Sequence, residues 1–121
     1  MRKALCPVLA LTVLAGCTRP APTQATPAAC GSAAPNAVTV DAALREGRAE
    51  PEPRRVEVPV HSPVLLGVTS DAAAEIHVHG YDLVYPVQPA SPACVLFVAD
   101  RTGVFDVEAH PDVLLLQLEV R

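Results

Sequence analysis

The chain has 121 residues, half of them hydrophobic, and carries 9 lysine and arginine residues against 13 aspartate and glutamate residues, for a formal net charge of −4. This length allows one ordinary domain. An acidic chain without basic clusters, whose only lysine is Lys3, argues against nucleic-acid binding and against electrostatic docking on anionic lipid.

Residues 1–16 have the anatomy of a bacterial export signal. Two basic residues open it, and an apolar run over residues 4–15 follows, too short to span a membrane. The run closes with Leu14-Ala15-Gly16-Cys17, which resembles the bacterial lipobox and implies that Cys17 becomes the acylated first residue of the mature protein. Acyl burial contributes about 0.8 kcal/mol per methylene, so palmitate-like chains would hold the protein on a membrane. The alternative is an ordinary signal peptide with a chance cysteine.

The export signal predicts a location in the cell envelope, on the periplasmic side of an inner or outer membrane or at the cell surface. Residues 17–37 are rich in alanine, proline and threonine, so we expect a flexible linker there. Cys6 leaves with the signal and Cys17 carries lipid, which leaves Cys30 and Cys94 as thiols. An exported location permits a Cys30–Cys94 disulfide, and the sequence leaves open whether it forms.

Residues 38–121 show the hydrophobic alternation of a β-domain. Expected strands lie at 38–40, 56–60, 64–70, 76–80, 95–99, 104–107 and 114–120. Residues 41–52 are polar and predict a loop or a turn of helix, and Pro59 favours an edge position for its strand. Six to eight short strands without a long helical period predict a β-sandwich, with Phe97 and Phe105 as buried anchors.

The segment at residues 75–82 carries the candidate chemistry. His77 and His79 point to the same face of a strand, with Cβ atoms about 6.5–7 Å apart, so two imidazoles can meet one metal ion. Neutral imidazole suits copper or zinc, which predicts a Cu(II) or Zn(II) site. His110 is the third candidate histidine ligand. Glu108 or Asp82 is the candidate oxygen donor. The alternative is a set of histidines satisfied by hydrogen bonds or by solvent.

The domain resembles the cupredoxin-like domains of small bacterial lipoproteins. The resemblance rests on residues 56–60, 68–71, 76–83, 99–108 with His110, and 116–120, and His-Val-His-Gly-Tyr-Asp is its most distinctive run. It implies a Greek-key β-sandwich in which His79 stands at the mid-chain copper ligand. Ala109 stands where the copper-binding cysteine would be, and no methionine follows Met1. The resemblance therefore disfavours a blue-copper centre and electron transfer of the cupredoxin type.

No catalytic residues stand out, because the chain has no evident nucleophile-and-base pair and no glycine-rich phosphate loop, so we expect a protein that is not an enzyme. The first hypothesis is metal handling at the cell envelope, by binding, buffering or delivery. The alternative is a metal-free β-sandwich that contacts another envelope protein or a cell-wall component. A third is a structural lipoprotein whose partner is encoded elsewhere.

Overall fold

The computed structural model describes residues 26–31 and 35–121, so the predicted signal peptide and the predicted lipidation at Cys17 lie outside the described residues. Every regular element in those two ranges is a β-strand. No helix in this part of the chain is long and apolar enough to cross a membrane.

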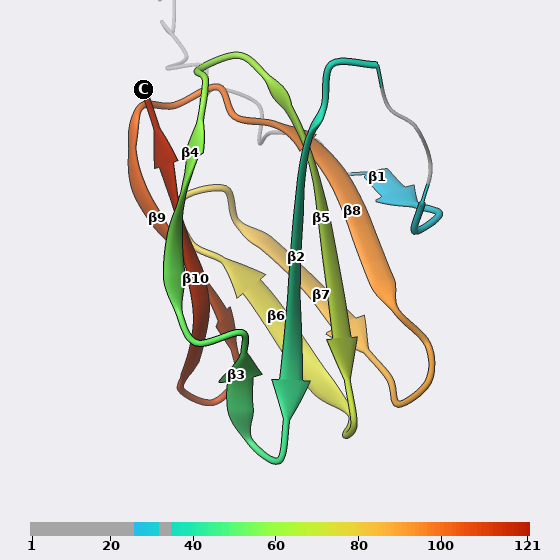
Figure 1. The fold of residues 1–121 in the computed structure, drawn as a ribbon. Coiled ribbons are helices and arrows are strands. Elements are labelled where there is room, and N and C mark those ends of the chain that lie inside the picture. Colours follow the sequence, from blue (N-terminus) through green and yellow to red (C-terminus); the bar gives the residue numbers. More distant parts are fainter. Residues whose placement is uncertain (1–25, 32–34) are drawn as a thin grey trace, which may run out of the picture.

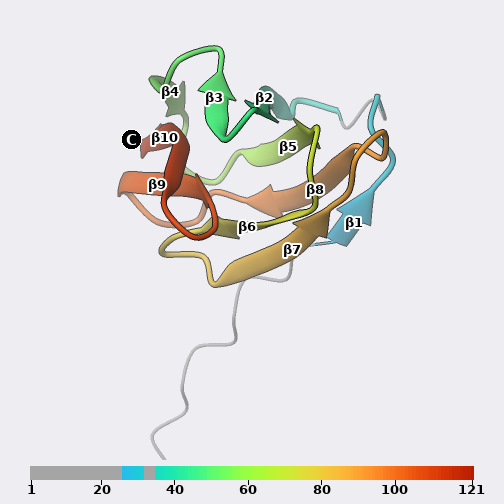
Figure 2. The same ribbon diagram turned by 90° about the horizontal axis from the view of Figure 1, so that it is seen from below.

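The described strands form two five-stranded sheets (Figure 1). The order in the first sheet is β1 (Thr26–Ala28), β8 (Ala93–Val98), β5 (Pro63–Ser70), β2 (Val38–Arg45) and β3 (Arg48–Glu50). The order in the second sheet is β4 (Arg54–Val58), β10 (Val113–Val120), β9 (Gly103–Ala109), β6 (Ala74–Val78) and β7 (Leu83–Val87). Figure 2 shows β2 and β5 in one layer and β6 and β7 in the other. The predicted all-β sandwich is confirmed.

Two parallel pairs distinguish this sandwich from a simple meander. β2 runs parallel to β5, and β4 runs parallel to β10, while the remaining neighbours are antiparallel. A parallel pair needs a connection that crosses out of its sheet. The chain therefore passes from β3 in the first sheet to β4 in the second, and from β4 back to β5, which locks the two layers together.

The core fills the space between the sheets because alternate residues of each strand are apolar. In β2, Val40, Ala42 and Leu44 are buried while the residues between them face outward, the period of two that a strand imposes. Phe97 is 2% exposed, as expected for a core anchor. Phe105 is only partly buried, because its ring lies at the rim of the core beside the turn that follows β6.

The loop expected at residues 41–52 is wrong for most of its length. β2 continues to Arg45, and a tight turn leads into β3. Glu46 and Gly47 have φ values of 48° and 73°, the positive values that a two-residue hairpin turn requires at both central positions. Pairing with β5 extends β2 through this polar segment. The hydrophobic pattern of residues 41–52 alone cannot predict a pairing with a strand elsewhere in the sequence.

The first sheet begins inside the segment predicted as a linker. β1 pairs antiparallel with β8, with Thr26 opposite Leu96 and Ala28 opposite Cys94. A disulfide joins Cys30 to Cys94 across 64 residues of sequence. Thr26–Ala28 therefore belong to the first sheet, although they lie before the predicted domain boundary at Val38. A strand rich in alanine and proline shows little hydrophobic alternation, so only its pairing with β8 identifies it as a strand.

Candidate metal-binding site

The outer face of β6 presents the two histidines that the alternation predicts. Ile76 and Val78 are fully buried on the inner face, so His77 and the residue just after the strand, His79, lie on the outer face. The His77 and His79 ring centroids are 4.1 Å apart, with the ring planes 34° from parallel. The sequence spacing thus brings these two imidazoles together.

His110 joins them from the neighbouring strand. It follows directly after β9, and its backbone N–H donates to the carbonyl of Glu75 over 2.9 Å, which extends the β6–β9 pairing by one residue. Its ring stacks on that of His77 with centroids 5.6 Å apart and an interplanar angle of 14°. The three rings therefore form a row on the outer face of the second sheet, with His77 in the middle.

Glu108 is the carboxylate that contacts this row. Its Oε2 lies 2.7 Å from Nε2 of His79, and its backbone stands opposite His77 in the β6–β9 register. An ionised carboxylate can only accept a hydrogen bond, so Nε2 of His79 carries the proton and donates it. In neutral His79 this leaves Nδ1 as the ring nitrogen with a free lone pair. Glu108 thus selects the tautomer of His79, as carboxylates do behind metal-bound histidines.

The row is assembled but is not arranged around a metal ion. Within residues 26–31 and 35–121, no three or more His, Cys, Asp or Glu side chains are placed so that they could hold one. The His110 ring stacks on that of His77, and the His79 ring is tilted by 34° against His77. Because the His79 side chain is 45% exposed, its ring has room to rotate, and metal binding requires such a rearrangement of the imidazoles.

The two other positions that the sequence analysis singled out, Asp82 and Ala109, contribute no metal ligand to the histidine row. Asp82 lies in the turn between β6 and β7 with a φ of 52°, and its carboxylate forms no hydrogen bond or ion pair within the described ranges. Ala109 is fully buried and faces the core, so a blue-copper thiolate has no counterpart at the end of β9. The ligand set of a blue-copper centre does not fit this chain, whereas the imidazole row offers nitrogen donors alone.

A set of contacts that the sequence did not predict holds the turn after His79. Gly80 has a φ of 78°, and a Cβ added there would lie 2.6 Å from Cε1 of Phe105 and closer still to Cδ1. The Tyr81 hydroxyl donates to the carbonyl of Arg101 over 3.1 Å, while the Arg101 guanidinium donates to the carbonyl of Gly80 and lies over the Tyr81 ring. Burial raises the pKa of the Tyr81 phenol.

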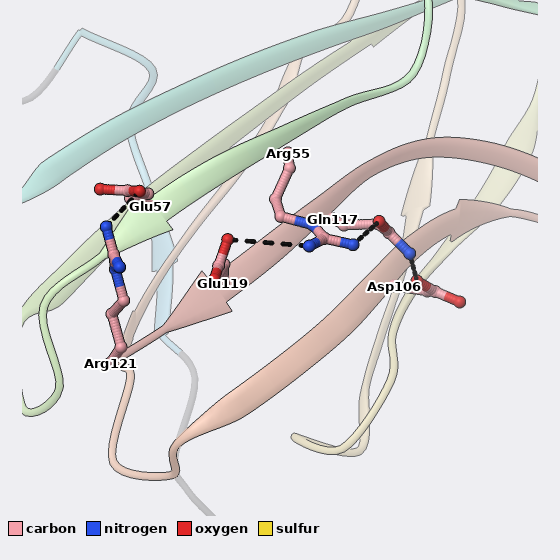
Figure 3. Close-up of polar contacts among 6 residues, drawn as sticks. All are labelled: Arg55, Glu57, Asp106, Gln117, Glu119 and Arg121. Carbon is pink, nitrogen blue, oxygen red and sulfur yellow. Dashed lines mark hydrogen bonds and ion pairs between the residues drawn. The ribbon is translucent and has the colours of Figure 1, made fainter.

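A polar network covers the same outer face beyond the histidines (Figure 3). Arg55 on β4 donates to Gln117 on β10 over 3.2 Å, and Gln117 donates to Asp106 on β9 over 2.8 Å. The carbonyl of Asp106 also accepts from the backbone N–H of His79. These bonds tie three strands to the start of the histidine turn.

The other ion pairs of Figure 3 lie at the exposed edge of this network. Arg55 is 3.9 Å from Glu119, and Arg121 donates to Glu57. The hydrogen bond from Arg121 lowers the pKa of the Glu57 carboxyl. Both arginines are thus engaged by carboxylates, and the positive charge of this face is balanced locally.

The comparisons with known proteins bear on the fold. No protein-family model and no curated protein matches this chain. Among solved structures, it is similar to the periplasmic domain of subunit II of cytochrome oxidase from Bradyrhizobium japonicum, at 15% identity over 69% of this chain and 83% of that one, with a TM-score of 0.54. It is also similar to a copper binding protein in its apo form, at 10% identity over 74% and 93%, with a TM-score of 0.59.

A third similar structure is a Cu(I) form of an amicyanin variant, at 18% identity over 84% of this chain and 95% of that one, with a TM-score of 0.52. Two copper oxidases match over a smaller share of their own length, 31% and 27%. At such identities a likeness concerns the fold and not the activity. The described part of the chain is therefore a cupredoxin-like β-sandwich.

Proposed function

We propose that this protein binds Cu(II) at the cell envelope through His77, His79 and His110, and that it handles copper there without being an enzyme. The observation that carries the proposal is the row of three imidazoles with Glu108 behind His79. The cupredoxin-like fold supports copper in particular, because neighbours of that fold include a copper binding protein and an amicyanin in its Cu(I) form. Nothing in the comparisons favours zinc.

The donor set defines the kind of copper site. Imidazole nitrogens bind Cu(II) tightly, and the described donors of the row include no thiolate or thioether that would favour Cu(I). Glu108 accepts a hydrogen bond from Nε2 of His79, so Nδ1 is the His79 nitrogen that would bind the ion once the imidazoles rearrange. The site is therefore a non-blue Cu(II) site with coordination positions open to water.

The position of the row suits exchange of the ion better than storage. His110 is exposed, and the three rings lie on the outside of the sheet, so a partner can reach a bound ion directly. The proposed location follows from the predicted signal and lipobox, which would tether the domain to an extracytoplasmic membrane surface. The Cys30–Cys94 disulfide is compatible with such an oxidising location.

The test is calorimetric titration of Cu(II) into the chain from residue 17 onward. A Cys17→Ser substitution prevents acylation, and this chain keeps β1 and both cysteines of the disulfide. We expect one Cu(II) per chain, and His79→Ala should weaken binding by about tenfold or more. The matched control is His61→Asn, which removes a histidine outside the row, at a φ of 68° that asparagine tolerates. Equal affinity in His79→Ala and His61→Asn would refute the site.

Glu108→Gln separates the orienting role of the carboxylate from direct coordination. An amide can turn its oxygen to accept the Nε2 proton, so binding should weaken far less than in His79→Ala. Absence of any Cu(II) binding would leave the alternative function, a metal-free module that contacts another envelope protein or a cell-wall component. That alternative draws on the absence, among the described residues, of three or more side chains placed to hold a metal ion.

A further inference from the structure

A cavity lies on the outer face of the first sheet, in the opposite layer from the histidine row. It is open to solvent and has a volume of about 390 Å³, and β2, β5 and β8 contribute to its lining. Both cysteines of the disulfide line it, together with Asp41, Glu50, Gly67 and Pro92. Cys30 is exposed and Cys94 is 9% exposed, so the disulfide is open to a small solute through the Cys30 side.

The carboxylate of Asp41 and the sulfur of Cys94 both lie close to Gly67. A Cβ added to Gly67 would lie 2.5 Å from Oδ1 of Asp41 and 3.2 Å from Sγ of Cys94. One methyl group would thus touch both atoms, which places the carboxylate and the sulfur on the same side of Gly67. A side chain at residue 67 would therefore clash with the Asp41 carboxylate.

The two carboxylates of the cavity, Asp41 and Glu50, differ in how they are paired. The Asp41 carboxylate forms no hydrogen bond or ion pair within residues 26–31 and 35–121, although the Asp41 backbone carbonyl accepts from Arg54. The second carboxylate of the cavity, Glu50, lies 3.8 Å from the guanidinium of Arg45. Of these two carboxylates, only that of Asp41 has no ion-pair partner among the described residues, although the Arg54 guanidinium lies at its backbone carbonyl.

We propose that this cavity is a charge-selective thiol–disulfide exchange site, in which Asp41 repels thiols of net negative charge, such as glutathione, and admits thiols of net positive charge. The incoming thiolate attacks Sγ of Cys30, the sulfur–sulfur bond breaks, and its electron pair goes to Sγ of Cys94, which then takes a proton from water. A second thiol attacks the mixed disulfide and frees Cys30, so the reductant leaves as its own disulfide.

Asp41 opposes this reaction in two ways. Its charge repels an anionic thiol that enters the cavity, and it disfavours the thiolate that must form on Cys94, since a nearby negative charge makes that thiol a poorer leaving group. The ammonium group of a thiol of net positive charge offsets both effects by pairing with the carboxylate. The exchange site needs no metal ion, and its test is independent of the proposed copper function.

The consequence concerns the attachment of the N-terminal segment to the domain. β1 contributes only three residues of pairing with β8, and the disulfide directly after it is the covalent link between the two. A site closed to anionic thiols keeps β1 on the sheet when glutathione is present. A cationic thiol opens the link and frees Cys30.

The experiment measures the rate of disulfide reduction in the chain from residue 17 onward with Cys17→Ser, in the presence of a chelator. Glutathione, 2-mercaptoethanol and cysteamine serve as anionic, neutral and cationic thiols, and each rate is divided by the thiolate concentration of its reagent. Asp41→Asn keeps the side-chain shape. Glu50→Gln is the matched control, because it removes a carboxylate from the same cavity.

We expect Asp41→Asn to accelerate reduction by glutathione about fivefold and to slow reduction by cysteamine, with both changes shrinking at high salt. Glu50→Gln should change these rates less, because Arg45 already offsets its charge. A variant that merely loosens the fold would accelerate all three thiols by one common factor. Such a common factor, an unchanged set of rates, or an equal effect of Glu50→Gln would overturn the proposal.

Discussion

The turn after β6 offers the sharpest test of how this fold positions its histidines. Gly80 has a φ of 78°, and an added Cβ would meet the ring of Phe105 at less than any real contact distance. In Gly80→Ala, an L side chain at positive φ costs about 1–2 kcal/mol, and overpacking against the ring adds about 1–3 kcal/mol. We therefore expect the free energy of unfolding to fall by about 2–5 kcal/mol, measured by urea denaturation.

Gly47 provides the matched control for this substitution. Its φ of 73° is nearly the same, but a Cβ added there meets nothing within 4 Å. Gly47→Ala should therefore cost only the backbone contribution, about 1–2 kcal/mol. The difference between the two variants measures the contact with Phe105. Equal destabilisation of both variants would refute the packing argument.

A second substitution at Phe105 tests the same contact from the other side. Phe105→Leu removes part of the ring that obstructs the added methyl group, so it should destabilise the Gly80→Ala background less than it destabilises the original chain. This coupling is expected for residues in contact. Strictly additive effects would show that the turn accommodates alanine by moving away from the ring.

Three further predictions concern the tyrosines and the disulfide. The buried hydroxyl of Tyr85 has no hydrogen-bond partner among the described residues, so Tyr85→Phe should leave urea stability unchanged or raise it by about 1 kcal/mol, whereas a loss would reveal a hidden partner. Burial raises the pKa of both Tyr81 and Tyr85. Folding therefore favours their neutral forms, so this stabilisation is complete below about pH 10 and is lost as the pH rises further. Absorbance titration should show phenolate formation displaced above that of the unfolded chain, and coincident curves would contradict it. Finally, Cys94→Ser removes a disulfide between residues 64 positions apart and should lower the free energy of unfolding by about 2–4 kcal/mol. An unchanged stability in urea would contradict this prediction.

The sequence alone was enough to predict which side chains of a strand face the core and which face outward. Side chains alternate strictly along an extended backbone, so the run from Ile76 to His79 already separates two buried residues from two outward-facing histidines. The same alternation identifies Leu116, Leu118 and Val120 as the inner face of the last strand. The resemblance at the histidine run pointed to the cupredoxin-like fold, which the structural neighbours bear out.

Only the tertiary structure decided which strands stand side by side and in what register. The pairing of β6 with β9 brings Glu108 to His79 and sets His110 beside Glu75. A bulge in β10 buries both Leu115 and its neighbour, where simple alternation would expose one of them.

The N-terminal edge of the first sheet shows the same dependence. β1 becomes a strand only because β8 is there to pair with it and Cys94 is there to hold Cys30. The physical reason is that side-chain direction is a property of each strand alone. Strand order and register follow from the free energy of all non-local pairings together, which no short stretch of sequence contains.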